Sequence, residues 1–286
     1  MSRRRAITLI VILSLILSGI LFINYNMRES TKSIDEISSS EYKAPANKAF
    51  DDSNFYKCVI DDYNDTKGGE SVPYTTNLSD AQLKTIKILS CESKKVTSLK
   101  GIEKLSNLET ALLSGNSLGN IDLSNSNSKL KDFEVSESKV ESIALGSKPN
   151  LTTLKLSENY LKKIEIGSIP KLGYLDVSNN QLNQNGIDLE SNTKLTYLNV
   201  SNCGLNTLTV SNNTNLVELY AGKNNLSSLN LNNNNKLINL GIENNNINDI
   251  DELALGTKAN LEYLNIENNE FTSINLENNT NLTWLV

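Results

Sequence analysis

The chain of 286 residues contains no histidine, and this absence excludes most common catalytic and metal sites. Histidine is the usual general base, the commonest metal ligand and the side chain that titrates near neutral pH. Ser/His and Cys/His nucleophile arrangements are therefore impossible. The carboxylates lie in repeated segments, with no sign of a pocket that would shift their pKa. We predict that the chain is not an enzyme and has no catalytic residue, metal ligand or cofactor.

A basic face and a phosphate-binding loop are also lacking. The net charge of −6 argues against a general nucleic-acid binder, which needs a positive surface. Lys67-Gly68-Gly69 lacks the other elements of a phosphate-binding glycine loop. The Asn/Asp-rich turns do not match the G-G-x-G-x-D calcium repeat. We expect no nucleic-acid partner.

The amino terminus carries a long apolar run, Ala6–Ile23, directly after Arg3, Arg4 and Arg5. A basic segment before an apolar core is typical of an export signal, and this run is just long enough to span a bilayer. Residues 1–26 are predicted to be a signal anchor with a transmembrane helix at about 6–23, or alternatively a cleaved signal peptide. Because the arginines hold the amino terminus in the cytosol, the rest of an anchored chain would be extracellular. Cleavage would instead release a secreted protein.

Two segments separate this run from the rest of the chain. Residues 27–48 are polar, without an apolar period, and are predicted to be a flexible spacer. In residues 49–84, Phe55, Val59 and Tyr63 lie four apart on one helical face, followed by a second short turn from Ala81. We interpret residues 49–84 as an α-helical cap.

The remainder repeats a unit of about 21 residues. In Asn260–Thr280, L-x-x-L-x-L is formed by Leu261, Leu264 and Ile266, and Asn269 follows three residues later. The first leucines of the units are Leu83, Leu108, Leu130, Leu151, Leu172, Leu195, Leu216, Leu237, Leu261 and Leu282. The L-x-L pair predicts a strand core in each unit, with Ile86/Ile88 in the first. One unit cannot bury its leucines alone, so neighbouring units must stack.

A polar residue follows each strand, and in six units it is an asparagine. These residues are Asn116, Asn159, Asn180, Asn224, Asn245 and Asn269. An amide both donates and accepts hydrogen bonds, so stacked asparagines can form a ladder that satisfies buried backbone groups. Cys91, Ser138 and Cys203 take this position in the other units, and the shorter Ser138 should weaken the ladder.

These motifs resemble the leucine-rich-repeat superfamily, L-x-x-L-x-L-x-x-N/C-x-L, over residues 83–286. Val96–Leu105 resembles the internalin-like type of bacterial cell-surface protein, and later units resemble short bacterial surface repeats. The resemblance implies a right-handed solenoid with a parallel β-sheet on its concave face. Because units of 21 residues leave no room for a full helix, we expect extended or 3₁₀ segments on the convex side. The chain stops in mid-strand near Trp284, so we expect a truncated repeat array rather than a core closed by Trp284.

Cys58 and Cys91 are the first two of three cysteines. A disulfide between them would fix the cap to the first coil and would suit an exported protein. Alternatively, both are buried thiols that pack as small hydrophobic groups.

Function is predicted on the concave sheet, where the residues beside the leucines are exposed. Tyr174 and Tyr197 take the same position in adjacent coils and should lie about 5 Å apart. The predicted ligand-binding residues are Tyr174, Asp176, Tyr197, Asn199, Tyr220, Tyr263 and Asn265. Exposed tyrosines are good anchors for a protein or glycan ligand, although tyrosine also has high strand propensity. The resemblance implies adhesion or recognition; the alternative is a stalk or spacer for a missing C-terminal domain.

Overall fold

The computed structural model describes residues 49–183, 186–248 and 251–286, which lie in one compact unit, Ala44–Val286. One continuous hydrophobic core runs through this repeat domain. The predicted membrane-spanning helix (6–23) and polar spacer (27–48) lie outside the described residues. None of the helices in the described part has the length and apolar character that crossing a membrane requires.

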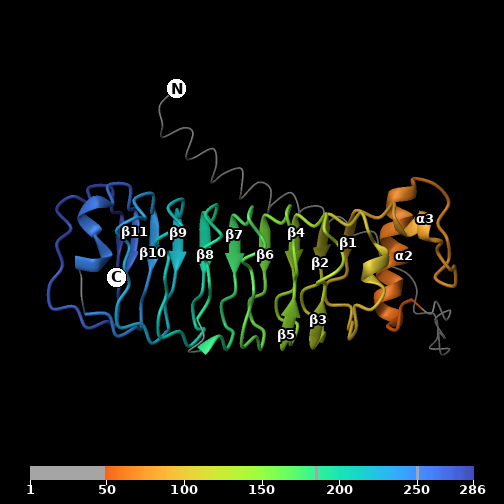
Figure 1. Ribbon diagram of the computed structural model, residues 1–286, viewed down its shortest axis with the longest axis horizontal. Helices are drawn as coiled ribbons and strands as arrows, with labels where there is room; N and C mark the ends of the chain where they lie inside the picture. Colours follow the sequence, from red (N-terminus) through yellow and green to blue (C-terminus); the bar gives the residue numbers. More distant parts are fainter. Residues whose placement is uncertain (1–48, 184–185, 249–250) are drawn as a thin grey trace, which may run out of the picture. The chain divides into compact units, whose positions relative to one another are not determined.

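Two helices stand at one end of the coils, where the cap was predicted (Figure 1). Helix α2, Ser53–Lys67, begins at Asp52, whose side chain accepts hydrogen bonds from two backbone N–H groups of the first turn. It ends at Gly68 with φ 63°, a left-handed conformation that glycine adopts without strain. Helix α3, Asp80–Leu83, begins with a capping box between Ser79 and Gln82.

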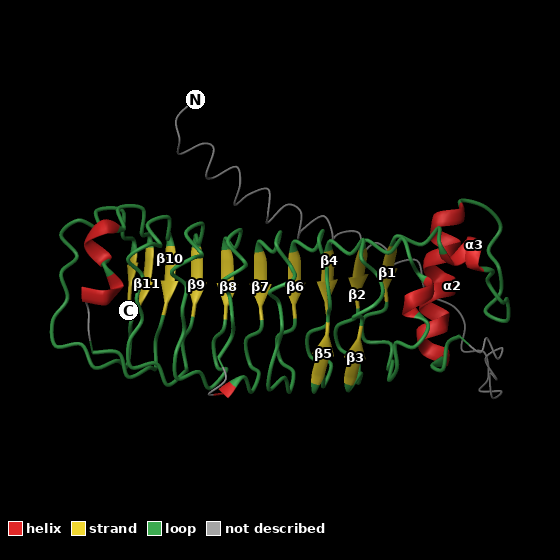
Figure 2. Cartoon of the chain, viewed as in Figure 1, coloured by secondary structure: helices red, strands yellow, loops and turns green. Residues whose placement is uncertain are grey.

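Ten parallel strands form the main sheet, and each pairs with the strand of the next coil (Figure 2). Their bounds are β1 Ile88–Ser90, β2 Thr110–Leu112, β4 Asp132–Glu134, β6 Thr153–Lys155, β7 Tyr174–Asp176, β8 Tyr197–Asn199, β9 Glu218–Tyr220, β10 Asn239–Gly241, β11 Tyr263–Asn265 and β12 Trp284–Leu285. Side chains alternate across a strand, so the central residue points into the core and its two neighbours point outward. In the main-sheet strands β2, β4, β6, β7, β8 and β9 the central residue is buried and its neighbours are half-buried. The predicted fold class is confirmed.

The opposite side of the coils is extended or 3₁₀, as expected. A second, two-stranded parallel sheet consists of β3, Asn120–Asp122, and β5, Ser142–Ala144. In the part of the chain that the structure describes, 3₁₀ helices include η1 Ile102–Lys104, η3 Asp251–Leu253 and η4 Leu255–Thr257.

The predicted register of the first unit was wrong. Ile86 and Ile88 were expected to form its strand core, but Leu89 pairs with Ala111, and Ile88 is 53% exposed. Cys91 therefore occupies a buried strand-core position instead of the asparagine position. Leu83 ends α3, and the spacing from Leu83 to Ile88 fits L-x-x-L-x-L as well as the true set from Ile86 does. The error arose because the first unit also packs against the cap.

A second row of buried polar residues lies on the convex side, three positions before each first leucine, and the motif search missed it. Its asparagines are Asn127, Asn192, Asn213, Asn234 and Asn279. Each of these side-chain amides donates to two backbone carbonyls of the preceding coil. Lys148 and Lys258 occupy the same position and are fully buried. Ile169 also occupies this position, but its side chain is apolar.

Lys258 carries a charge into the core without a carboxylate partner in the described residues. Its Nζ donates to the Leu231 carbonyl at 3.0 Å and to the Ala254 carbonyl at 3.2 Å. Burial lowers the pKa of Lys258 to about 8 from its ordinary value of 10.5. Both carbonyls also accept backbone N–H groups, so neither is left unpaired if the amine is removed.

Replacing Lys258 by methionine is therefore expected to raise the free energy of unfolding by about 1–2 kcal/mol at pH 7. Below pH 8 the amine is charged in both states, so the burial penalty is fully present there. Between pH 8 and 10.5 the unfolded chain binds more protons, so wild-type stability rises with pH and the advantage of Lys258→Met shrinks. Urea unfolding at pH 7 and pH 10 measures both effects. The exposed Lys194→Met is the control, and an advantage that does not shrink at pH 10 contradicts this account.

Candidate functional site

The outward positions of the strands form the sheet face, and strand register sets the neighbours on it. Tyr174 is paired with Tyr197, and Tyr197 with Glu218, in β7, β8 and β9. One row further along, Asp176 is followed by Asn199 and Tyr220. Backbone pairing continues beyond the strands, since the Asn179 N–H donates to the Ser201 carbonyl at 2.9 Å. The residue two positions after each strand therefore also belongs to the sheet face.

A tyrosine cluster, Tyr174, Tyr197 and Tyr220, occupies the middle of this face. The rings of Tyr174 and Tyr197 are stacked, with centroids 4.0 Å apart and planes 4° from parallel. The Tyr220 ring is tilted by 51° against Tyr197 at 5.8 Å. The Lys155 amine lies 5.6 Å from the centroid of the Tyr174 ring. The stacked pair forms because identical residues stand at one register position of adjacent strands.

Burial raises the pKa of all three phenols above the ordinary value of 10, and neighbouring hydroxyl and carboxylate groups contribute to the shifts. The Tyr220 hydroxyl donates to Glu218 Oε2 at 3.0 Å. The cluster therefore presents neutral hydroxyl groups beside a carboxylate at neutral pH. Neutral hydroxyl groups both donate and accept hydrogen bonds, which suits the binding of a polar ligand.

The side chains of three predicted binding residues also stabilise turns by hydrogen bonds to the backbone. Asp176 Oδ1 accepts from the backbone N–H and the hydroxyl of Ser178 at 3.0 and 2.7 Å. Asn199 and Asn265 each accept from the N–H two residues later, at 3.1 Å. One oxygen of each side chain is therefore used within the protein.

Tyr263 stands in the row of Tyr174 and Tyr197 but apart from the cluster, because Glu218 and Asn239 occupy the two positions between. The sequence placed Tyr174 beside Tyr197, with Tyr220 two residues further along its strand and Tyr263 back in the row of the first two; the contact between Tyr220 and Tyr197 appears only in the structure.

Two glycines beside the cluster were not singled out from the sequence. A Cβ at Gly222 would lie 2.3 Å from Glu243 Oε1, and a Cβ at Gly241 would lie 3.1 Å from the Tyr220 ring. Glu243 therefore lies directly over the backbone of Gly222, just after β9, and Tyr220 lies directly over the backbone of Gly241 in β10. The signal was the absence of a side chain at two sheet-face positions: at the position of Gly222 other coils have serine or glutamate, and at the position of Gly241 the adjacent coils have Tyr220 and Asn265.

The asparagine ladder lies inside the coils, at the turns that follow the carboxyl ends of the strands. Asn180 is typical: its Nδ2 donates to the carbonyls of Leu156 and Val177, and its Oδ1 accepts from the Leu161 N–H at 3.0 Å. Equivalent bonds are made by Asn116, Asn159, Asn224, Asn245 and Asn269.

Two ladder positions hold other residues. Ser138 Oγ accepts from the Asn116 N–H at 3.2 Å and donates to the Ser136 carbonyl at 2.8 Å. That Ser138 weakens the ladder stays a prediction. Cys203 is free, and its Sγ donates to the Val177 carbonyl at 3.1 Å. Burial raises the pKa of the Cys203 thiol to about 12, so this cysteine is a poor nucleophile.

Cys58 and Cys91 are joined in a disulfide, with Cα atoms 5.5 Å apart. The bond links α2 to the end of β1 and fixes the cap on the first coil. Asp62, also on α2, accepts from the Ser90 N–H at 2.8 Å and reinforces this junction.

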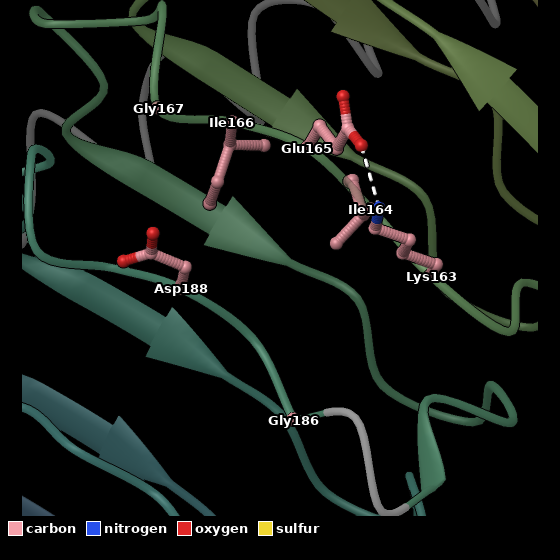
Figure 3. Close-up of a pocket in the computed structure, with 7 residues that line it drawn as sticks. All are labelled: Lys163, Ile164, Glu165, Ile166, Gly167, Gly186 and Asp188. Atoms are coloured by element: carbon pink, nitrogen blue, oxygen red, sulfur yellow. Dashed lines mark hydrogen bonds and ion pairs between the residues drawn. The ribbon is translucent and has the colours of Figure 1, made fainter.

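A hollow on the coils, away from the sheet face, is lined by Lys163, Ile164, Glu165, Ile166, Gly167, Gly186 and Asp188 (Figure 3). Its charged side chains are exposed, and Lys163 is paired with Glu165 at 2.7 Å. Its isoleucines are buried in the core. Among the described residues that line it, none is a buried polar group, so this lining lacks the features of a specific site.

Among solved structures, the chain is similar to the functional domain of InlJ from Listeria monocytogenes, which includes a cysteine ladder, at 29% identity and a TM-score of 0.75. This match covers 84% of the chain and 50% of the InlJ chain, so the present chain spans about half the length of that relative.

Two further structures show the fold alone. Internalin C2 from Listeria monocytogenes is 24% identical with a TM-score of 0.62, and the match covers 87% of this chain and 99% of the other. A leucine-rich-repeat protein of Leptospira interrogans is 16% identical with a TM-score of 0.53, and the match covers 79% of each chain. No protein-family profile and no curated protein matches the chain.

Stacked parallel strands and an asparagine ladder define a leucine-rich-repeat solenoid. Together with the likeness to the InlJ domain, they show that this chain has an internalin-like leucine-rich-repeat fold.

Proposed function

We propose that this chain is an extracellular recognition protein that binds a protein or glycan ligand through the sheet face. The observation that carries the proposal is the stacked pair Tyr174–Tyr197, which lies on the open side of the sheet instead of in the core. Tyrosines contribute strongly to binding because they bury a large rigid surface and keep a polar end. The internalin-like fold supports a protein-binding or adhesion role.

The binding test uses the repeat domain, residues 44–286, on protein and glycan arrays beside Tyr174→Ala/Tyr197→Ala. Loss of both rings is expected to weaken binding by at least about tenfold. Tyr160→Ala, which removes a tyrosine that is 49% exposed away from the cluster, is the matched control. Circular dichroism and urea unfolding verify that all variants are equally folded.

Three outcomes are distinguishable. A ligand retained by wild type and Tyr160→Ala but lost by the double variant supports the proposal. Equal binding by the double variant moves the site to another surface. The absence of any ligand favours the alternative, a stalk or spacer.

The proposed location is the outer face of the cell membrane, with a single pass formed by residues 6–23 and the amino terminus in the cytoplasm. Support comes from Arg3–Arg5 before the apolar run. Full-length protein should remain in membranes after alkaline washing, and external protease should digest its repeats in intact cells. Release into the medium of a chain that lacks its first residues would show the secreted alternative.

A further inference from the structure

From the sheet face of β7 to β11, we infer that the ligand is a protein segment carrying exposed lysine or arginine side chains. This inference rests on the proposed function and specifies the chemistry of its partner. It follows from two independent features: which parts of the tyrosine rings remain accessible, and which charges surround them.

The ring faces of the cluster are largely used within the protein. Tyr174 stacks on Tyr197 on one side and has the Lys155 amine over its ring. Tyr197 is covered on the side of β9 by the tilted Tyr220. Tyr220 in turn rests along Gly241, where a Cβ would be only 3.1 Å from the ring.

A sugar ring binds an aromatic side chain through its flat face, so such a platform must leave that face free. Here Tyr197 has another ring on each side, and Tyr174 has a ring on one side and the Lys155 amine on the other, so we expect a ligand to contact mainly ring edges and hydroxyl groups. Edges and hydroxyls suit hydrogen bonding and contact with extended aliphatic stems, such as those of lysine and arginine. The geometry therefore favours a polypeptide ligand over a stacked glycan.

On the β8 to β11 side of the cluster the sheet-face charges are all negative, whereas on the β6 side the Lys155 amine lies near the Tyr174 ring and is paired with Glu134. The sheet-face positions from β7 to β11, including the residue two beyond each strand, hold four carboxylates and no lysine or arginine. They are Tyr174, Asp176, Ser178, Tyr197, Asn199, Ser201, Glu218, Tyr220, Gly222, Asn239, Gly241, Glu243, Tyr263, Asn265 and Glu267.

The two carboxylates nearest Tyr220 are held in place. Glu218 Oε2 accepts from the Tyr220 hydroxyl at 3.0 Å. The Glu243 carboxylate lies above Gly222, close enough that a Cβ there would clash with it. Neither is in a salt bridge in the described residues, whereas Glu134 further along the sheet pairs with Lys155 at 2.8 Å. A lysine or arginine of a ligand would therefore meet carboxylates that are fixed in position beside the phenols and are not neutralised by a salt bridge. Complementary charge of this kind contributes to the choice of binding partner.

The test presents immobilised 15-residue peptides of three kinds, lysine/arginine-rich, glutamate-rich and serine-rich, together with a glycan array, to the repeat domain (44–286). Wild type is compared with Glu218→Gln/Glu243→Gln, which removes two charges with little change of shape. Glu141→Gln/Glu190→Gln, at exposed positions off the sheet face, is the control with the same change of net charge. Tyr174→Ala/Tyr197→Ala reports on the sheet face itself.

We expect wild type and the control to bind basic peptides at least about tenfold more tightly than the other peptides. Glu218→Gln/Glu243→Gln should lose about tenfold, and raising the salt from about 0.05 to 0.5 M should weaken binding of wild type more than of this variant.

The inference is overturned if no basic peptide is retained, or if the two glutamate pairs have equal effects. Tyrosine-dependent binding of neutral peptides or glycans would also overturn it, while leaving the proposed function standing. Binding that is unaffected by the tyrosine variant would remove both.

Discussion

Replacing Cys58 and Cys91 together by alanine is expected to lower the free energy of unfolding of the repeat domain by about 3–4 kcal/mol. The bond closes a loop with a sequence separation of 33 residues, and the chain entropy of the unfolded state scales with such a loop. Both residues are buried, and alanine introduces no polar group in their place. Urea unfolding measures the loss.

The loss should be concentrated at one end of the solenoid. Each coil contacts mainly its neighbours, so opening of the cap propagates weakly along the array. Hydrogen exchange should speed up in α2 and β1 while the amides of β8 and β9 stay protected. A reducing agent should reproduce the effect in wild type and change nothing in the double variant. If reduction leaves wild-type stability unchanged, the disulfide does not stabilise the cap.

Replacing Asn180 by leucine is expected to lower the free energy of unfolding by about 2–3 kcal/mol. The variant keeps the volume but leaves the buried N–H of Leu161 without its acceptor, Asn180 Oδ1. The carbonyls lose less, because Leu156 also accepts from Asn159 Nδ2 and Val177 from Cys203 Sγ.

The matched control is Asn233→Ala, which removes an exposed amide that bonds to the Ser211 carbonyl at 3.1 Å. It should cost less than about 0.5 kcal/mol. Equal losses from the two variants would mean that the ladder position needs only a side chain of the right volume.

Much of the fold could be predicted because the same sequence motif, with the same local structure, occurs in every coil. The L-x-L pairs determine which side chains enter the core. Where the motif of one coil is ambiguous, the register of the other coils indicates the correct assignment. Ambiguity remained where the repeat meets a different structure. In the first unit, Leu83 mimics a repeat leucine but belongs to α3, and the true strand is centred on Leu89.

The second buried row was missed although its signal was present in the sequence. Asn127, Asn192 and Asn234 all stand three residues before a first leucine, as N-x-K-L. In an asparagine-rich chain such residues look like solvated turns. Only the packed structure shows that their amides are buried, and Lys148 and Lys258 at the same position could not be recognised as core residues from charge alone.

The candidate site was predictable in position but not in detail. Sequence register placed Tyr174 beside Tyr197, and the structure stacks them. Which ring faces stay open depends on Lys155 and Tyr220, whose side-chain directions the repeat pattern does not specify. Strand register pairs Gly241 with Tyr220, and two residues further along it sets Gly222 opposite Glu243, but register does not specify that these side chains lie over the glycines.

The central claim is that ligand binds on the tyrosine cluster, and hydroxyl-radical footprinting of the repeat domain with and without a ligand retained on the arrays tests it most directly. Tyr74 and Tyr160, which are 39% and 49% exposed and lie outside the cluster, serve as internal references. The account predicts that ligand slows oxidation of Tyr174, Tyr197 and Tyr220 several-fold and leaves both references unchanged. Protection of Tyr74 or Tyr160 with unchanged oxidation of the cluster would contradict it.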